Sequence, residues 1–174
     1  FAVERTVSAF ASSMGSDASA EALTMREVLI DALADSVDAN ELASEKVAAC
    51  LGAVGTVTTE PEQMSHSATD KGIHVLSSLV EQLQPEVAQL AATAVSNLFD
   101  AVEVNAAGDS RTVTESDQQK TVQRLLNLSD ILERTTVALG RDLVVGEQPA
   151  VLDTARFRLS AYPSFGAPES QTVN

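Results

Sequence analysis

Apolar residues recur at helical spacing in six successive segments of the sequence, and this recurrence constrains the fold more than any other feature. Residues three and four positions apart lie on one face of an α-helix, so each segment predicts a helix with one apolar stripe. The segments cover roughly residues 3–14, 24–37, 38–54, 67–83, 85–102 and 115–139. Together they predict an all-α fold of about six antiparallel helices in a bundle.

Residue types at the starts of these segments favour helix N-termini. Thr24, Asp38, Ser67 and Thr114 are each followed three residues later by a carboxylate, which is the spacing of a capping box. Pro85 fits the first turn of a helix, where its missing N–H costs nothing. Aromatic residues make up only 3% of the 174-residue chain, so the core is expected to consist of Leu, Val, Ile and Ala.

The stripes also predict which side chains are buried. In the first segment, Val3, Val7, Phe10 and Met14 form one apolar stripe. In the third, Cys50 lies within the apolar run from Val47 to Leu51, so we expect a small buried side chain rather than a nucleophile.

The pattern changes after Gly140, which is a plausible helix stop. The stretch from Gly146 to Pro149 predicts a turn, and residues 156–161 alternate polar and apolar as a half-buried strand does. A single strand leaves its backbone groups unpaired. We therefore expect an interaction strand that pairs with a neighbouring β domain or lies along the helices, formed by Arg156, Phe157, Arg158 and Leu159. The sequence divides into a helical bundle domain, 1–140, and a linker with this strand, 141–174.

The charge of the chain argues against two classes of partner. The net charge is −14, and Lys and Arg never cluster, so no electrostatic footprint for nucleic acid is present. An anionic membrane surface would repel such a chain. Direct insertion is not expected either, because no run approaches the roughly 18 apolar residues that a membrane span needs.

No arrangement of residues points to catalysis, a metal or a cofactor. His66 and His74 lack a second His or Cys at the spacing of a zinc site. Asp31 and Asp35 lie one helical turn apart, but a solvated helix face explains such a pair in so acidic a chain. The Gly-x-Ser-x-Gly motif of a serine hydrolase is absent. We therefore expect a protein that is not an enzyme and needs no cofactor.

One short motif bears on localisation. Asn127-Leu128-Ser129 matches the N-glycosylation acceptor pattern, although it falls within an expected helix. The first residues, Phe1-Ala2-Val3, contain neither Met nor a signal peptide, which indicates a processed product or an excised piece.

The order of elements resembles a known domain family. Residues 125–132 (Leu-Leu-Asn-Leu-Ser-Asp-Ile-Leu) give way to 142–149 (Asp-Leu-Val-Val-Gly-Glu-Gln-Pro) and then to the strand 156–159 (Arg-Phe-Arg-Leu). This order resembles the helical first part of a GAIN-type domain, as found in polycystin-1-like proteins with a receptor-for-egg-jelly region and in adhesion receptors. In that family a Leu-Val-Pro-Gly-Glu-like turn leads to the first strand of a β-sandwich, and here Val145 replaces the proline.

The resemblance implies an extracellular or ciliary surface location, in a larger membrane-associated protein whose β-sandwich packs against this chain. The family's autoproteolysis triplet, His-Leu-Ser/Thr, has no counterpart, because Ser67 follows His66 and Val75 follows His74. The expected function is thus a non-catalytic structural module, partnered by other domains of the same polypeptide or by proteins of a larger assembly.

Two other functions are compatible with the same pattern. A self-contained helical-bundle adaptor would bind a partner's helix along an exposed apolar strip, for which Leu98, Phe99 and Val102 are candidates. A small-ligand carrier or enzyme would hold its pocket between helices and would need convergent polar groups there.

Overall fold

The computed structural model describes residues 2–14, 19–38, 42–108, 114–144 and 148–163. These residues form six α-helices and two strands: α1 (Ala2–Ser13), α2 (Ala20–Asp38), α3 (Ser44–Val57), α4 (His66–Val80), α5 (Ala88–Gly108), α6 (Glu115–Gly140), β1 (Ala150–Asp153) and β2 (Arg158–Ala161). Single 3₁₀ turns, η1 (Pro61–Gln63) and η2 (Pro85–Val87), precede α4 and α5. The expected all-α bundle with β structure at its C-terminal end is confirmed.

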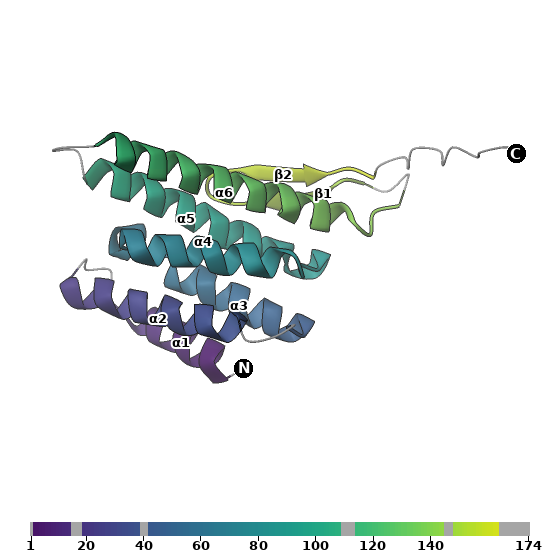
Figure 1. Cartoon of the computed structure of the whole chain (residues 1–174). Helices are drawn as coiled ribbons and strands as arrows, with labels where there is room; N and C mark the ends of the chain where they lie inside the picture. Colours follow the sequence, from purple (N-terminus) through teal and green to yellow (C-terminus); the bar gives the residue numbers. More distant parts are fainter. Residues whose placement is uncertain (1, 15–18, 39–41, 109–113, 145–147, 164–174) are drawn as a thin grey trace, which may run out of the picture.

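The helices stack as successive antiparallel pairs (Figure 1). Helix α1 packs on α3 and α3 on α5, while α2 packs on α4 and α4 on α6. The odd-numbered helices therefore form one layer and the even-numbered helices a second. Strand β1 lies against α5 and β2 against α6, so the strands close one end of the stack. Helices α1 and α2 form the other end.

The core between the layers is aliphatic, as the composition predicts. The stripe of the fourth helical segment is buried throughout, at Ile73, Leu76, Val80 and Leu83. Seven alanines of α3, α4 and α5 are fully or almost fully buried, at positions 53, 68, 88, 91, 92, 94 and 101. Because their side chains are small, the helices of this core pack at close range.

The capping predictions had mixed outcomes. At α6 the capping box is present, with the Asp117 N–H donating to Thr114 Oγ1 at 3.2 Å and the Thr114 N–H donating to Asp117 Oδ2 at 3.2 Å. Helix α4 starts slightly earlier than expected, because Ser65 rather than Ser67 accepts from the Ala68 N–H at 3.0 Å.

The expected start of the second helix at Thr24 is wrong. Helix α2 begins at Ala20, and the Ser19 hydroxyl accepts from the Ala22 N–H at 3.1 Å. Thr24 lies inside the helix and donates to the Ala20 carbonyl. Asp38 likewise ends α2 rather than opening α3, and residues 39–41 lie outside the described part of the chain.

Arg26 is the least expected core residue, since its side chain is only 1% exposed. Its Nε donates to Gln63 Oε1 at 2.8 Å and its Nη1 donates to the Val57 carbonyl. Burial lowers the pKa of Arg26, and the negative charge of Glu60 partly offsets this by raising it. The guanidinium thus provides a donor for the last carbonyl of α3 and links α2 to the turn η1 that follows α3.

A second polar cluster joins α4 to α6. Arg124 is nearly buried and makes a two-pronged ion pair with Asp70, with N–O distances of 2.6 and 2.8 Å. Its Nη1 lies 2.9 Å from His66 Nδ1, and because arginine only donates, that nitrogen accepts. His66 is the first residue of α4.

The expected stripe of α1 is buried only in part. Val7 is buried, but Val3 and Phe10 are 43% and 52% exposed. At one end of its layer, α1 packs mainly on α3 and α2 among the described elements, so the stripe is wider than the surface they cover.

Candidate docking site: the C-terminal β-hairpin

The expected interaction strand has a partner within the chain. Strand β2 pairs antiparallel with β1, in a register that places Ala150 opposite Ala161 and Asp153 opposite Arg158. Sequence reasoning missed β1, which is short and lacks polar–apolar alternation. The available signal was the apolar stretch 150–152, separated from the expected strand by three residues, which is a common hairpin spacing.

The loop of the hairpin is closed by its own hydrogen bonds. The Thr154 N–H donates to the Phe157 carbonyl at 3.0 Å, and the Phe157 N–H donates to Thr154 Oγ1 at 3.1 Å. Of the four residues predicted for the strand, Arg158 and Leu159 lie in β2, while Arg156 and Phe157 lie in the loop before it. The alternating segment is therefore part loop and part strand.

The inner face of the hairpin is apolar and covers the end of the helical stack. Leu152 and Ala161 are almost fully buried, and Leu159 is partly buried against the core. Gly140 permits this close approach, because a Cβ built on it would lie 3.3 Å from the Ala161 Cβ. Gly140, the last residue of α6, therefore favours the close packing of β2 on that helix.

Arg156 attaches the loop to α5 through ion pairs with two carboxylates. Its Nε and Nη2 donate to Asp100 Oδ1 at 3.0 and 2.8 Å, and its Nη1 and Nη2 donate to the two Glu103 oxygens at 2.9 and 2.6 Å. These hydrogen bonds lower the pKa of Glu103 and raise that of Arg156. Asp100 and Glu103 lie one helical turn apart, which matches the fork of the guanidinium.

Aromatic contacts support the same attachment. The guanidinium carbon of Arg156 lies 5.7 Å from the centre of the Phe99 ring, within the range of a cation–π contact. The Phe157 ring meets Phe99 edge to face, with centroids 6.2 Å apart and an interplanar angle of 75°. A further hydrogen bond, from Gln89 Nε2 to the Asp153 carbonyl, holds the end of β1 to α5 at 3.0 Å.

These contacts cover the apolar strip that a helix-binding adaptor would need to expose. Leu98 and Val102 are buried in the core, and Phe99 is partly buried under Arg156 and Phe157. The expected exposed strip is therefore covered by the chain itself.

The outer face of the hairpin is exposed and mixed in character. Val151 on β1 is 39% exposed, and Tyr162 immediately after β2 is more exposed still. Asp153 and Arg158, opposite each other, form an ion pair at 3.4 Å. Within the described residues the sheet has only these two strands, so each strand has one edge without a β partner.

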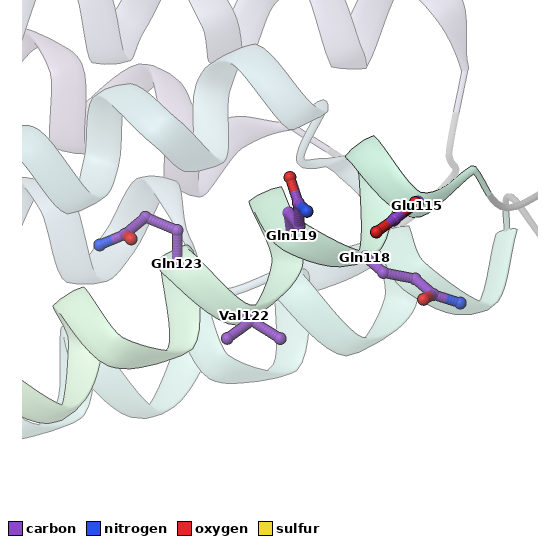
Figure 2. Close-up of a pocket in the computed structure, with 5 residues that line it drawn as sticks. All are labelled: Glu115, Gln118, Gln119, Val122 and Gln123. Atoms are coloured by element: carbon purple, nitrogen blue, oxygen red, sulfur yellow. The ribbon is translucent and has the colours of Figure 1, made fainter.

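Two of the surface hollows among the described residues lie on the helical stack. One, of about 460 Å³, lies along the first turns of α6 and is lined by Glu115, Gln118, Gln119, Val122 and Gln123 (Figure 2). All five residues come from a single helix, so the hollow does not enclose a ligand. A second, of about 430 Å³, lies beside the start of α3 and η2. Its polar lining includes Glu45, Gln82 and Glu86.

Cys50 is fully buried, as expected. Burial raises the pKa of its thiol to about 11, and the neighbouring Glu4 carboxylate acts in the same direction. The sulfur lies 3.7 Å from Glu4 Oε1. A thiol in this environment stays protonated at neutral pH and is a poor nucleophile.

The glycosylation candidate Asn127 lies on the exposed face of α6. Its Oδ1 accepts from Gln123 Nε2 at 2.8 Å, and the Ser129 hydroxyl donates to the Leu125 carbonyl. Both side chains of the acceptor motif are thus on the surface, within a regular helix. His74 is also exposed on its helix.

Among the described residues, no group of three or more His, Cys, Asp or Glu side chains is placed to hold a metal ion. No helix in those ranges is both long enough and apolar enough to cross a bilayer. No protein family, curated protein or solved structure matches the chain.

Proposed function

We propose that this chain is a non-catalytic structural module of a larger extracellular or ciliary surface protein, in which the hairpin docks on a neighbouring β-sandwich. The observation that supports this proposal most is the attachment of the hairpin to the stack. Arg156 binds Asp100 and Glu103 on α5 while the inner face of the hairpin is buried. A hairpin held in one orientation can present its outer face and edges to a second domain without a large ordering cost.

The surface of the hairpin suits a β domain better than a helix. Sheet edges bind partners by adding strands, and β1 and β2 each have one such edge within the described residues. Val151 and Tyr162 add apolar area to the outer side. The resemblance to a GAIN-type domain supports the choice of a β-sandwich as the neighbour.

The structure favours this function over the adaptor alternative. A helix-in-groove adaptor needs an open apolar groove, and the strip expected for it is filled by Phe157 and the core. A ligand carrier or enzyme needs an enclosed pocket with convergent polar groups, whereas the hollow along α6 is lined by residues of that one helix.

Hydrogen exchange in two forms of the protein tests the proposal. Exchange would be measured by mass spectrometry on the isolated chain and on the polypeptide purified from its natural source, whose intact mass is determined first. If a β-sandwich pairs with the hairpin, peptides covering 150–161 exchange at least about tenfold more slowly in the natural polypeptide.

Helix α2 serves as the internal control, because it lies at the end of the stack opposite the hairpin and should exchange equally in both forms. Equal exchange of the hairpin peptides in the two forms would refute the docking proposal. A natural polypeptide no larger than this chain would refute it as well.

A further inference from the structure

The acceptor motif Asn127-Leu128-Ser129 occurs once in the 174 residues. Asn40, Asn97 and Asn105 are each followed two positions later by an apolar residue. The motif lies in the middle of α6, where the side chain of its central residue, Leu128, is fully buried in the core. Asn127 and Ser129 on either side are exposed. The two side chains that define the motif therefore both reach solvent.

The side-chain amide nitrogen of Asn127 is available for substitution. Asn127 Oδ1 accepts from Gln123 Nε2 at 2.8 Å, whereas none of the hydrogen bonds among the described residues is donated by Asn127 Nδ2. The residues one turn before and one turn after, Gln123 and Asp130, are exposed as well. A bulky group on Nδ2 therefore costs the described fold neither an internal hydrogen bond nor a core contact.

We propose that Asn127 carries an N-linked glycan. The proposal rests on the extracellular location in the proposed function, because N-glycans are added to chains that enter the secretory pathway. The co-reactant is a lipid-linked diphosphate oligosaccharide. Asn127 Nδ2 forms a bond to the anomeric carbon of its first N-acetylglucosamine and loses one proton. The bond from that carbon to the diphosphate oxygen breaks, and the lipid diphosphate leaves with the electron pair.

This transfer takes place before α6 forms. Asn127 and Ser129 point about 200° apart around a regular helix, so the folded chain does not bring the hydroxyl to the amide. The Ser129 hydroxyl donates instead to the Leu125 carbonyl at 2.8 Å. In the unfolded chain a local turn brings the two side chains together. The helix then forms with the glycan in place, which the exposure of Asn127 permits.

The glycan and a docked β domain are sterically compatible. Arg134 lies two turns after Asn127 on the same side of α6 and pairs with Glu81, at the end of α4, at 3.3 Å. Asn127 thus lies on the side of α6 that faces α4. The hairpin loop is attached to α5 instead, through Arg156. The glycan therefore leaves the hairpin accessible.

The polypeptide purified from its natural source tests the proposal. Peptide mapping by mass spectrometry is done before and after treatment with peptide N-glycosidase F, which leaves Asp where a glycan was attached. We expect most copies of the peptide containing Asn127 to lose an oligosaccharide on treatment and to gain Asp at this position. An Asn127 without a glycan in the natural polypeptide would overturn the proposal.

A secreted form of the chain provides the matched variants. The 174-residue chain is expressed behind a secretion signal in mammalian cells, and its mass is compared before and after the same treatment. Ser129→Ala removes the exposed acceptor hydroxyl and should abolish the mass shift. Ser129→Thr keeps the hydroxyl and should retain the shift. A shift that persists in Ser129→Ala would overturn the assignment to Asn127.

The secreted form also separates failure of the site from failure of the proposed function. If Asn127 carries a glycan in the secreted chain but not in the natural polypeptide, the natural chain does not enter the secretory pathway, and the extracellular location fails together with the glycan. If Asn127 is unmodified in both, only the glycan proposal fails. Docking of the hairpin then still depends on its own hydrogen-exchange test.

Discussion

Leu152 provides the sharpest test of whether the hairpin folds together with the helices. Its side chain is 7% exposed and belongs to the single hydrophobic core of the described residues. Leu152→Ala removes three carbon atoms, at about 0.8 kcal/mol each. Allowing for partial collapse of the cavity, we expect the free energy of unfolding to fall by about 2–3 kcal/mol.

The assay is urea unfolding followed by far-ultraviolet circular dichroism, a signal dominated by the helices. With an m-value of about 2 kcal/mol/M, the expected loss shifts the midpoint by about 1–1.5 M. Val151→Ala is the matched control on the same strand, because Val151 is 39% exposed and faces outward. We expect it to cost about 0.5 kcal/mol, mainly through β-propensity.

The circular dichroism of the helices reports on the hairpin substitution only if the hairpin and the helices unfold in one transition. Equal and small effects of Leu152→Ala and Val151→Ala would refute the reasoning, because the hairpin would then detach without cost to the stack. Hydrogen exchange at 150–161 distinguishes that case by showing local opening in both variants.

Three further predictions concern other parts of the molecule. Gly52→Ala should raise the free energy of unfolding by up to about 1 kcal/mol, because nothing lies within 4 Å of the added Cβ. Gly72→Ala should lower the free energy of unfolding by about 1 kcal/mol, because its Cβ would lie 3.1 Å from the buried Leu98 side chain. Thermal unfolding of both variants tests the difference. Cys50 should resist Ellman's reagent at pH 8 until urea unfolds the chain, and rapid labelling of the native protein would contradict its burial. Hydrogen bonds lower the pKa of Glu103 in the folded state, so its carboxylate stabilises the fold above the ordinary carboxyl pKa. This contribution is lost as the pH falls through the lowered pKa. Glu103→Gln should therefore reduce the loss of the free energy of unfolding with falling pH, as measured by urea unfolding at several acidic pH values.

The ion pairs of Arg156 and Arg124 differ in what they contribute. Arg156 is partly exposed, and its carboxylate partners are more exposed still, so its main effect is to orient the hairpin rather than to stabilise the fold. The Arg124 side chain is only 9% exposed, although Asp70 is 55% exposed, so this pair is less screened on the arginine side than the contacts of Arg156. The first contact bears on the proposed docking of the hairpin, and the second on the packing of α4 against α6.

Local pattern alone was sufficient to predict most of the helices. A helix is stabilised by contacts between residues three and four apart, so the stripe from Ile73 to Leu83 could be read without knowing its neighbours. The capping box at Thr114 was also predictable, because both of its partners lie within one turn. Where two cap patterns lay close together, as at Ser65 and Ser67, local pattern could not choose between them.

The tertiary structure decided the features on which the proposed function depends. Arg156 meets Asp100 and Glu103 across more than fifty residues of chain, and no local spacing encodes that contact. The short strand β1 depends on β2 for its backbone hydrogen bonds, so it carries no strong pattern of its own. Val3 and Phe10 show the converse: their spacing predicts burial, but burial needs a neighbour on that side of α1, and this chain does not provide one within its described residues.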